Sequence, residues 1–92
     1  MPVAFAITVC GRVQGVGYRA HALRTADALR IAGWVANRRD GTVAVEATGV
    51  PEDLEAFVAA LRAGPPGAEV TDVRVTRINP ERVSGATFEI RT

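Results

Sequence analysis

The sequence contains few residues that could bind a metal ion or form a disulfide. Its 92 residues include one cysteine, Cys10, and one histidine, His21. A single cysteine excludes a disulfide within the chain and is typical of proteins from a reducing compartment, so we expect a cytoplasmic location. Because a structural zinc site takes four ligands, most often Cys and His, we expect no metal site.

The sequence also lacks a strong excess of charge of one sign. Its 11 basic and 10 acidic residues give a net charge of +1 at pH 7, and the two kinds are interspersed along the chain. A nucleic-acid-binding surface usually carries a clear excess of basic residues. We therefore expect no nucleic-acid partner.

Long apolar runs are absent as well. No run approaches the roughly 18 residues of a membrane-spanning helix. The N-terminal Met-Pro-Val-Ala-Phe has neither the basic region nor the long apolar segment of a secretory signal. We therefore expect no membrane partner. A chain of this length forms one two-layer core that buries roughly 60–65% of its unfolded surface, which predicts a single domain over residues 1–92.

What the sequence does contain is a glycine-rich stretch at residues 10–19, Cys-Gly-Arg-Val-Gln-Gly-Val-Gly-Tyr-Arg. Glycines let a loop curl so that its N–H groups converge, and the helix that follows favours an anion at its N-terminus. The spacing fits neither a dinucleotide-binding loop nor a P-loop. A plain strand-to-helix connection remains the alternative, but Arg19, whose planar guanidinium binds two oxygens of one phosphate, favours an anion site.

The pattern of apolar residues predicts the order of strands and helices. Alternating apolar residues predict strands, and apolar residues three or four apart predict helices. The strands are predicted at residues 3–9, 33–37, 42–48, 70–78 and 87–91, and the helices at 19–32 and within 49–63. This β-α-β-β-α-β order plus a short C-terminal strand predicts an α+β fold, the ferredoxin-like split β-α-β sandwich. Its two helices lie on one face of a mixed, mainly antiparallel sheet.

Some residues have predicted positions within this fold. The strand at 3–9 is apolar on both faces, which predicts a central place in the sheet. The apolar phase slips between Val70 and Val73, so the strand at 70–78 could begin later than its first residue. We expect Trp34 and Phe57 in the core. We expect His21 on the surface, because two helical residues separate it from Arg19 by about 200° around the axis.

Two segments resemble the signatures of the acylphosphatases. The first is Gly11-Arg12-Val13-Gln14-Gly15-Val16-Gly17-Tyr18-Arg19, and the second is Gly33-Trp34-Val35-Ala36-Asn37-x-x-x-Gly41-x-Val43 followed by Gly49. The separation of the two segments and the chain length are those usual in the family, and the resemblance spans essentially the whole sequence. Two positions depart from the pattern: Tyr18 stands where the family usually has phenylalanine, and Arg30 near where many relatives have glycine.

The resemblance implies an enzyme that hydrolyses a carboxyl–phosphate mixed anhydride to a carboxylate and inorganic phosphate, without a metal or a cofactor. It implies that Arg19 binds the phosphate and that Asn37 positions the attacking water. It also implies a phosphate cradle made by the backbone N–H groups of Gly15, Val16, Gly17, Tyr18 and Arg19. The expected partners are a small-molecule acyl phosphate as substrate and inorganic phosphate, or a similar anion, as product or inhibitor. We expect a monomer.

The chemistry is consistent with so small a set of residues. A carboxylate is a good leaving group, so no strong acid is needed, and phosphoryl transfer depends mainly on positioning and electrostatic stabilisation. An amide is a poor base, so Asn37 is assigned to orientation of the water. The alternatives are a non-catalytic anion-binding or regulatory domain, or an acylphosphatase-like module of a larger enzyme that handles carbamoyl phosphate. An RNA-binding module is disfavoured because the strand at 42–48 has no aromatic residue.

Overall fold

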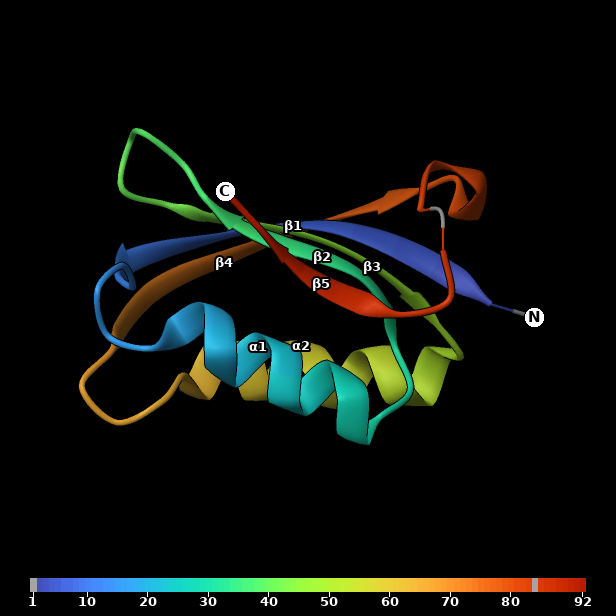
Figure 1. Cartoon of the computed structure of the whole chain (residues 1–92), viewed down its shortest axis with the longest axis horizontal. Helices are drawn as coiled ribbons and strands as arrows, with labels where there is room; N and C mark the ends of the chain where they lie inside the picture. Colours follow the sequence, from blue (N-terminus) through green and yellow to red (C-terminus); the bar gives the residue numbers. More distant parts are fainter. Residues whose placement is uncertain (1, 84) are drawn as a thin grey trace.

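The computed structural model describes residues 2–83 and 85–92, and it contains a five-stranded sheet with two helices on one face (Figure 1). The elements are β1 (Val3–Arg12), α1 (Tyr18–Ala28), β2 (Ala32–Asn37), β3 (Val43–Gly49), α2 (Pro51–Ala63), β4 (Glu69–Ile78), the short 3₁₀ helix η1 (Pro80–Arg82) and β5 (Phe88–Arg91). The predicted ferredoxin-like α+β fold is confirmed. Met1 and Ser84, the latter within the loop predicted at 79–85, lie outside the described residues.

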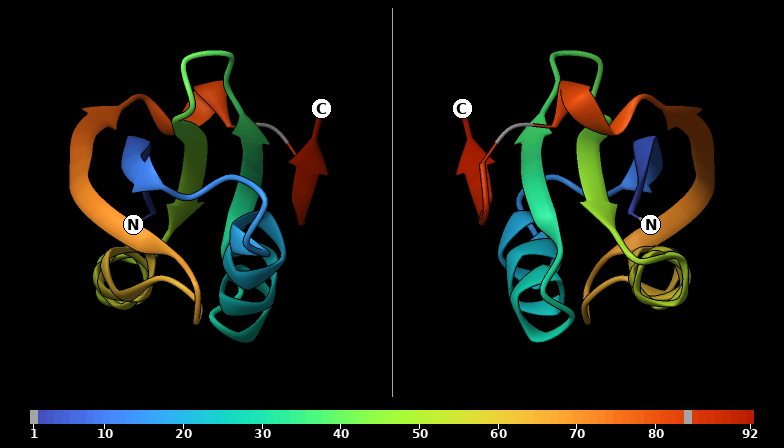
Figure 2. Two further views of the ribbon diagram at one scale, coloured as in Figure 1. Left: turned by 90° about the vertical axis from the view of Figure 1, so that its left-hand side faces the viewer. Right: turned by 90° about the vertical axis from the view of Figure 1, so that its right-hand side faces the viewer.

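The sheet has the order β4-β1-β3-β2-β5. β1 pairs antiparallel with both β3 and β4, so its predicted central position is confirmed. β2 is antiparallel to β3, and β5 joins it on the other side as the one parallel strand of this sheet. Figure 2 shows α1 below β2 and β5, and α2 below β4 and β1. Together the two helices cover most of that face.

The phase slip in β4 marks a bulge, and the strand does not begin late. Cys10 pairs with Asp72 and Gly11 with Val70, which leaves Thr71 as an extra residue on β4. Gly11 has φ +120°, and a Cβ at this position would overlap the carbonyl oxygen of Glu69. The close approach of the two backbones at the bulge therefore requires glycine.

The first helix ends earlier than predicted, at Ala28 instead of residue 32. The N–H of Ile31 donates to the carbonyl of Ala26 at 2.8 Å, and the N–H of Arg30 to the carbonyl of Asp27 at 3.3 Å. This pair of bonds is the Schellman motif, which places Arg30 in the left-handed region, with φ 56°. Apolar spacing continues through Ile31, so the sequence pattern did not indicate the stop.

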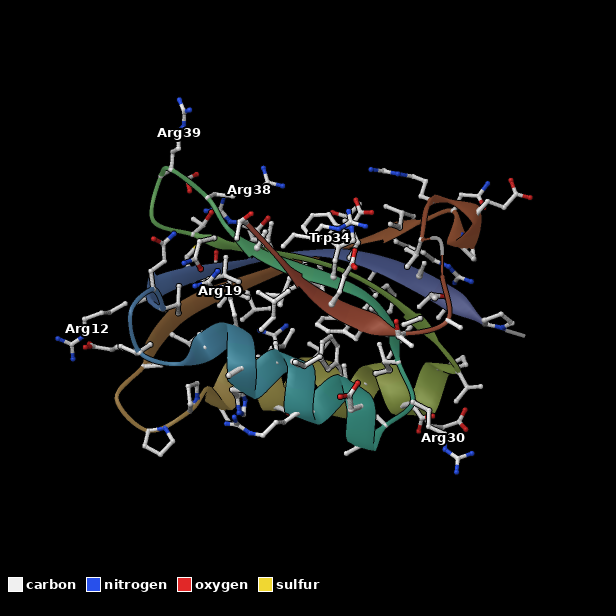
Figure 3. The ribbon with its side chains drawn as sticks, viewed as in Figure 1. Arg12, Arg19, Arg30, Trp34, Arg38 and Arg39 are labelled. Carbon is white, nitrogen blue, oxygen red and sulfur yellow. The ribbon has the colours of Figure 1, made fainter. Side chains whose placement is uncertain are left out.

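The core lies between the sheet and the helices and contains Phe57, which is fully buried and meets Phe88 edge to face, with ring centroids 5.7 Å apart. The prediction for Trp34 was wrong. Its neighbour Val35 points into the core, so Trp34 lies on the opposite face of β2, where the guanidinium of Arg91 stands 5.1 Å from its ring centroid (Figure 3). Successive strand residues face opposite sides of a sheet.

Arg30→Gly should stabilise the fold, because the exposed Arg30 holds a backbone conformation that costs a non-glycine residue roughly 1–2 kcal/mol. After the greater chain entropy of unfolded glycine is subtracted, we expect the free energy of unfolding to rise by about 0.5–1 kcal/mol. Urea denaturation measures this. Arg24→Gly, at an exposed position inside α1, is the matched control and should destabilise by about 1 kcal/mol. Destabilisation by both changes would contradict the prediction.

Candidate functional site

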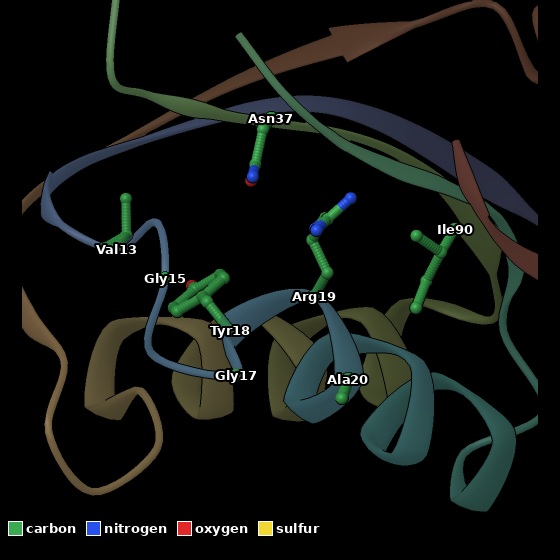
Figure 4. A pocket seen from close by; sticks show the side chains of 8 residues that line it. All are labelled: Val13, Gly15, Gly17, Tyr18, Arg19, Ala20, Asn37 and Ile90. Carbon is green, nitrogen blue, oxygen red and sulfur yellow. The ribbon is translucent and has the colours of Figure 1, made fainter. Parts of the chain in front are cut away.

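A cavity of about 250 Å³ opens where the glycine loop, the first turn of α1 and the ends of β2 and β5 meet (Figure 4). Its lining residues are Val13, Gly15, Gly17, Tyr18, Arg19, Ala20, Asn37 and Ile90. The structure thus brings Arg19 and Asn37, which belong to different layers, to one cavity. Of the five predicted loop residues, Val16 does not line the cavity, because its half-buried side chain packs against the core.

The loop meets α1 in a way that suits an anion. Gly15 and Gly17 both adopt positive φ, at 76° and 79°, and a Cβ on either would meet nothing within 4 Å. Gly17 directly precedes α1, none of the described side chains caps the helix, and its first turn holds no acidic residue. The first N–H groups of a helix have no acceptor within the helix. Those of α1 are therefore available to an anion, which the helix dipole also favours.

Arg19 and Asn37 point into the cavity from opposite sides, Arg19 from α1 and Asn37 from the end of β2 (Figure 4). In the described part of the chain, the ion pairs are made by Arg12, Arg74, Arg82 and Arg91, so the half-buried Arg19 has no carboxylate partner there. A guanidinium in the first turn of a helix also faces an unfavourable dipole. A bound anion would give the Arg19 guanidinium an oppositely charged partner and would offset the unfavourable interaction with the helix dipole.

The side-chain oxygen of Asn37 is buried and, among the residues described, has no hydrogen-bond partner. Buried polar atoms are nearly always hydrogen-bonded, to protein or to ordered water. Because Asn37 lines the cavity, a water molecule there is an accessible donor for this oxygen. The cavity therefore has a hydrogen-bond acceptor for water, the Asn37 oxygen, on one side, and Arg19 with the first N–H groups of α1, which suit an anion, on the other.

Tyr18 anchors the start of α1 to the neighbouring helix. Its ring is 1% exposed, and its hydroxyl donates to the carbonyl of Leu61 in the last turn of α2, at 2.7 Å. Burial raises the pKa of Tyr18, so the hydroxyl stays protonated and keeps donating at neutral pH. The hydroxyl that distinguishes this tyrosine from phenylalanine therefore binds α2 and leaves the loop backbone in place.

The turn after Asn37 is fixed by local hydrogen bonds. The carboxylate of Asp40 accepts from the hydroxyl of Thr42 at 2.6 Å and from its N–H at 3.0 Å. These bonds, with the charge of Arg38, lower the pKa of Asp40. The carboxylate therefore remains ionised and bonded at neutral pH.

His21 does not lie on the surface, contrary to the prediction. It is half-buried between the helices, with Nε2 3.0 Å from the carbonyl oxygen of Ala60, and it does not line the cavity. The rotation around the helix axis between Arg19 and His21 correctly predicted that His21 points away from the cavity. Because α2 covers that side of α1, the side chain is half-buried there. Within residues 2–83 and 85–92, no three His, Cys, Asp or Glu side chains form a group suited to a metal, and no helix could span a membrane.

Sequence reasoning did not assign to the site three residues that line the cavity, Val13, Ala20 and Ile90, nor Gln14, which lies beside it. Gln14 donates from its side-chain nitrogen to the carbonyls of Arg38 at 2.7 Å and Thr42 at 2.9 Å, which ties the glycine loop to the turn after Asn37. Its place inside the first signature was the available signal. Ile90, 40% exposed on β5, supplies an apolar wall of the cavity, and no local pattern indicated it.

The fold and the cavity define a class of protein, a ferredoxin-like α+β domain with a cavity at a helix N-terminus whose lining suits an anion. The model of the acylphosphatase family matches residues 5–90. The chain is 52% identical to the acylphosphatase of Cupriavidus necator over 81 residues, 88% of this chain and 85% of that one. It resembles the crystal structure of the Bacillus subtilis acylphosphatase with a TM-score of 0.91 and 41% identity, over 98% and 99% of the two chains.

The chain therefore belongs to the acylphosphatase family, hydrolases whose substrates are small-molecule acyl phosphates. A third match is to HypF of T. kodakarensis, with a TM-score of 0.83 and 31% identity, and it covers 98% of this chain but 12% of HypF. Since the acylphosphatases are matched over most of their length, the alternative of a module from a larger enzyme is not favoured.

Tyr18→Phe should destabilise the protein without stopping hydrolysis. The change leaves the carbonyl of Leu61 without its donor in a buried site, and we expect the free energy of unfolding to fall by about 1–1.5 kcal/mol. Since the loop backbone is unaltered, kcat should stay within about threefold. Urea denaturation and turnover of an acyl phosphate on the same preparation measure the two effects. Unchanged stability, or a large loss of kcat at intact stability, would disprove this role.

Proposed function

We propose that the cavity between the glycine loop and Asn37 is the catalytic site for acyl phosphate hydrolysis. Arg19 and the backbone N–H groups of residues 15–19 bind the phosphate, and Asn37 orients the attacking water. The observation that carries this proposal is the meeting of two groups in one cavity. Among residues 2–83 and 85–92, Arg19 has no carboxylate partner and the buried side-chain oxygen of Asn37 has no donor.

In the proposed reaction, the water oxygen attacks phosphorus, a new P–O bond forms, and the bond from phosphorus to the acyl oxygen breaks. The bonding electron pair leaves with the acyl oxygen, which gives a carboxylate. The two protons of the attacking water stay on the phosphoryl oxygens, so the other product is inorganic phosphate, which then exchanges protons with solvent. Charge spreads over the equatorial oxygens of the phosphoryl group in the transition state. Arg19 and the N–H groups at the start of α1 are fixed donors directed at that charge, and such preorganised donors stabilise it more than water does.

Asn37 acts on the nucleophile. Its side-chain oxygen accepts a hydrogen bond from water, and this bond directs a lone pair of the water toward phosphorus. An amide does not take up the proton, and the carboxylate leaving group does not require an acid. Asn37 lies at the end of β2, where it pairs with Val43 of the neighbouring strand β3, and this pairing holds its backbone in place. A rigid strand suits a residue whose role is orientation.

The wider proposal follows from the sequence and the family. Residues 1–92 act as one domain and one monomer that needs no metal or cofactor. Inorganic phosphate, which carries the same oxygens as the substrate phosphoryl group, binds the same groups as product and inhibitor. The near-neutral charge supports a protein without a nucleic-acid or membrane partner, and the single cysteine supports a cytoplasmic location.

The purified protein should hydrolyse benzoyl phosphate in the presence of a chelator, because the proposed site contains no metal ligand set. The measurement is the rate of benzoyl phosphate loss with excess EDTA, compared with the same sample supplied with magnesium. Equal rates well above the spontaneous rate are expected. A folded protein that gives only the spontaneous rate would overturn the proposal and favour a non-catalytic anion site.

Asn37→Ala and Arg19→Ala should separate catalysis from binding. We expect Asn37→Ala to lower kcat by about 10²–10³-fold and to leave the Kd for inorganic phosphate within about threefold, since it removes an orienting group only. Arg19→Ala should lower kcat and also weaken phosphate binding by about tenfold or more, because a charge-assisted bond is lost.

Arg12→Ala is the matched control for the loss of one positive charge. Arg12 is in the first signature, but its side chain is 72% exposed and points away from the cavity (Figure 3). Its kcat and its Kd for phosphate should stay near those of the native protein. If Asn37→Ala weakened phosphate binding as much as Arg19→Ala, the assigned division of roles would be wrong.

A further inference from the structure

Gln14 connects two parts of the site without touching the cavity. It belongs to the glycine loop but is not among the residues that line the cavity. Both of its amide hydrogens are used, one on the carbonyl of Arg38 at 2.7 Å and one on the carbonyl of Thr42 at 2.9 Å. A glutamine side chain has two donors on one nitrogen, so this residue satisfies two acceptors of a distant segment at once.

The two acceptors close the turn that follows Asn37. The N–H of Arg38 donates to the carbonyl of Thr42 at 2.9 Å, and this bond joins the two ends of the turn between β2 and β3. Asn37 is the residue directly before Arg38. The amide of Gln14 therefore binds the turn at its base, one residue from the side chain proposed to orient the water.

The sheet alone does not fix the loop against this turn. The pairing of β1 with β3 ends at Val9 and Val43, so no ladder of backbone hydrogen bonds joins the two segments beyond these residues. Among the described residues, the hydrogen bonds between segment 13–17 and segment 38–42 are the two made by Gln14. This one amide therefore supplies the hydrogen bonds that join the glycine loop to the turn after Asn37 in the described part of the chain.

We propose that Gln14 is a positioning residue that holds Asn37 at its working distance from the phosphate-binding loop. The inference rests on the proposed function, since the working distance is the one between bound phosphate and oriented water. A displacement of the order of 1 Å between reacting groups costs about 10²-fold in rate. Phosphate binding itself should depend little on Gln14, because Arg19 and the N–H groups of α1 remain in place.

The test uses Gln14→Met, which keeps the length of the side chain and removes both donors, and Gln14→Glu, which sets a carboxylate against two carbonyl oxygens. We expect kcat on benzoyl phosphate to fall by about 10–100-fold in both, more in Gln14→Glu, with the Kd for inorganic phosphate within about threefold. Equal loss of phosphate binding and kcat would overturn the proposal, because it would indicate collapse of the loop.

Asp40→Ala is the control for stability of the same turn. It removes the two bonds from Thr42 to the carboxylate, at 2.6 and 3.0 Å, and leaves the bonds of Gln14 in place. We expect its kcat to stay within about threefold of the native value. If Asp40→Ala lowered kcat as much as Gln14→Met, general loosening of the turn would explain both, and the specific role of Gln14 would be refuted.

A double variant tests whether Gln14 acts through Asn37. If it does, Gln14→Met added to Asn37→Ala should lower the remaining kcat by less than about twofold, since the residue to be positioned is already gone. If the double variant lost kcat by the product of the two single losses, Gln14 would act independently of Asn37, which would contradict the proposal.

Nuclear magnetic resonance gives a readout that does not need turnover. Gln14→Met should shift the side-chain amide signals of Asn37, and Asp40→Ala should shift them less. Unmoved Asn37 signals overturn the positioning role even in an active enzyme. If the Asn37 signals shift in Gln14→Met but the native protein does not hydrolyse acyl phosphates, the positioning role of Gln14 holds and the proposed function fails.

Discussion

The site depends on the register of three adjacent strands. Val9 of β1 pairs with Val43 of β3, and Val43 pairs with Asn37 of β2. Side chains paired across strands share a face, and Val9 and Val43 are fully buried in the core, so Asn37 also faces the helix layer. A slip of one residue would turn it to the open face, where Trp34 lies. The same antiparallel pairing brings the loop after β1 and the turn before β3 to one end of the sheet (Figure 1).

The glycine loop is held from both layers of the fold. On the sheet side, Gln14 binds the turn after Asn37. On the helix side, Tyr18 and His21 bind the carbonyls of Leu61 and Ala60 at the C-terminal end of α2. The carbonyl of Leu61 belongs to the last turn of α2, where carbonyls have no donor within the helix, so the bond from Tyr18 satisfies it. The carbonyl of Ala60 also accepts from the N–H of Gly64 at 3.0 Å, so His21 adds a second contact there. A loop with two glycines at positive φ thereby gains a fixed shape from residues outside the cavity.

The sequence was informative where structure is local and less so where it depends on distant contacts. The strand and helix order followed from apolar spacing, and the meeting of Arg19 with Asn37 followed from the resemblance. The stop of α1 was missed because apolar spacing continues to Ile31 while the backbone reverses at Arg30. Trp34 was misplaced because both faces of β2 carry apolar residues, so alternation could not identify the inner face. The bonds of Gln14 reach 24 and 28 residues along the chain, beyond any local pattern.

The cavity also explains why so few side chains suffice in the proposed mechanism. Its polar side consists of Arg19, Asn37 and backbone N–H groups, and its apolar side of Val13, Ala20 and Ile90. Backbone donors at a helix start need no side chain of their own and lose no rotamer entropy when an anion binds. A cation facing a helix dipole, and an amide oxygen that has no donor among the described residues, are features that a phosphoryl group and a water molecule would satisfy together. The groups whose placement is electrostatically unfavourable for the protein alone are therefore the groups proposed to carry the reaction.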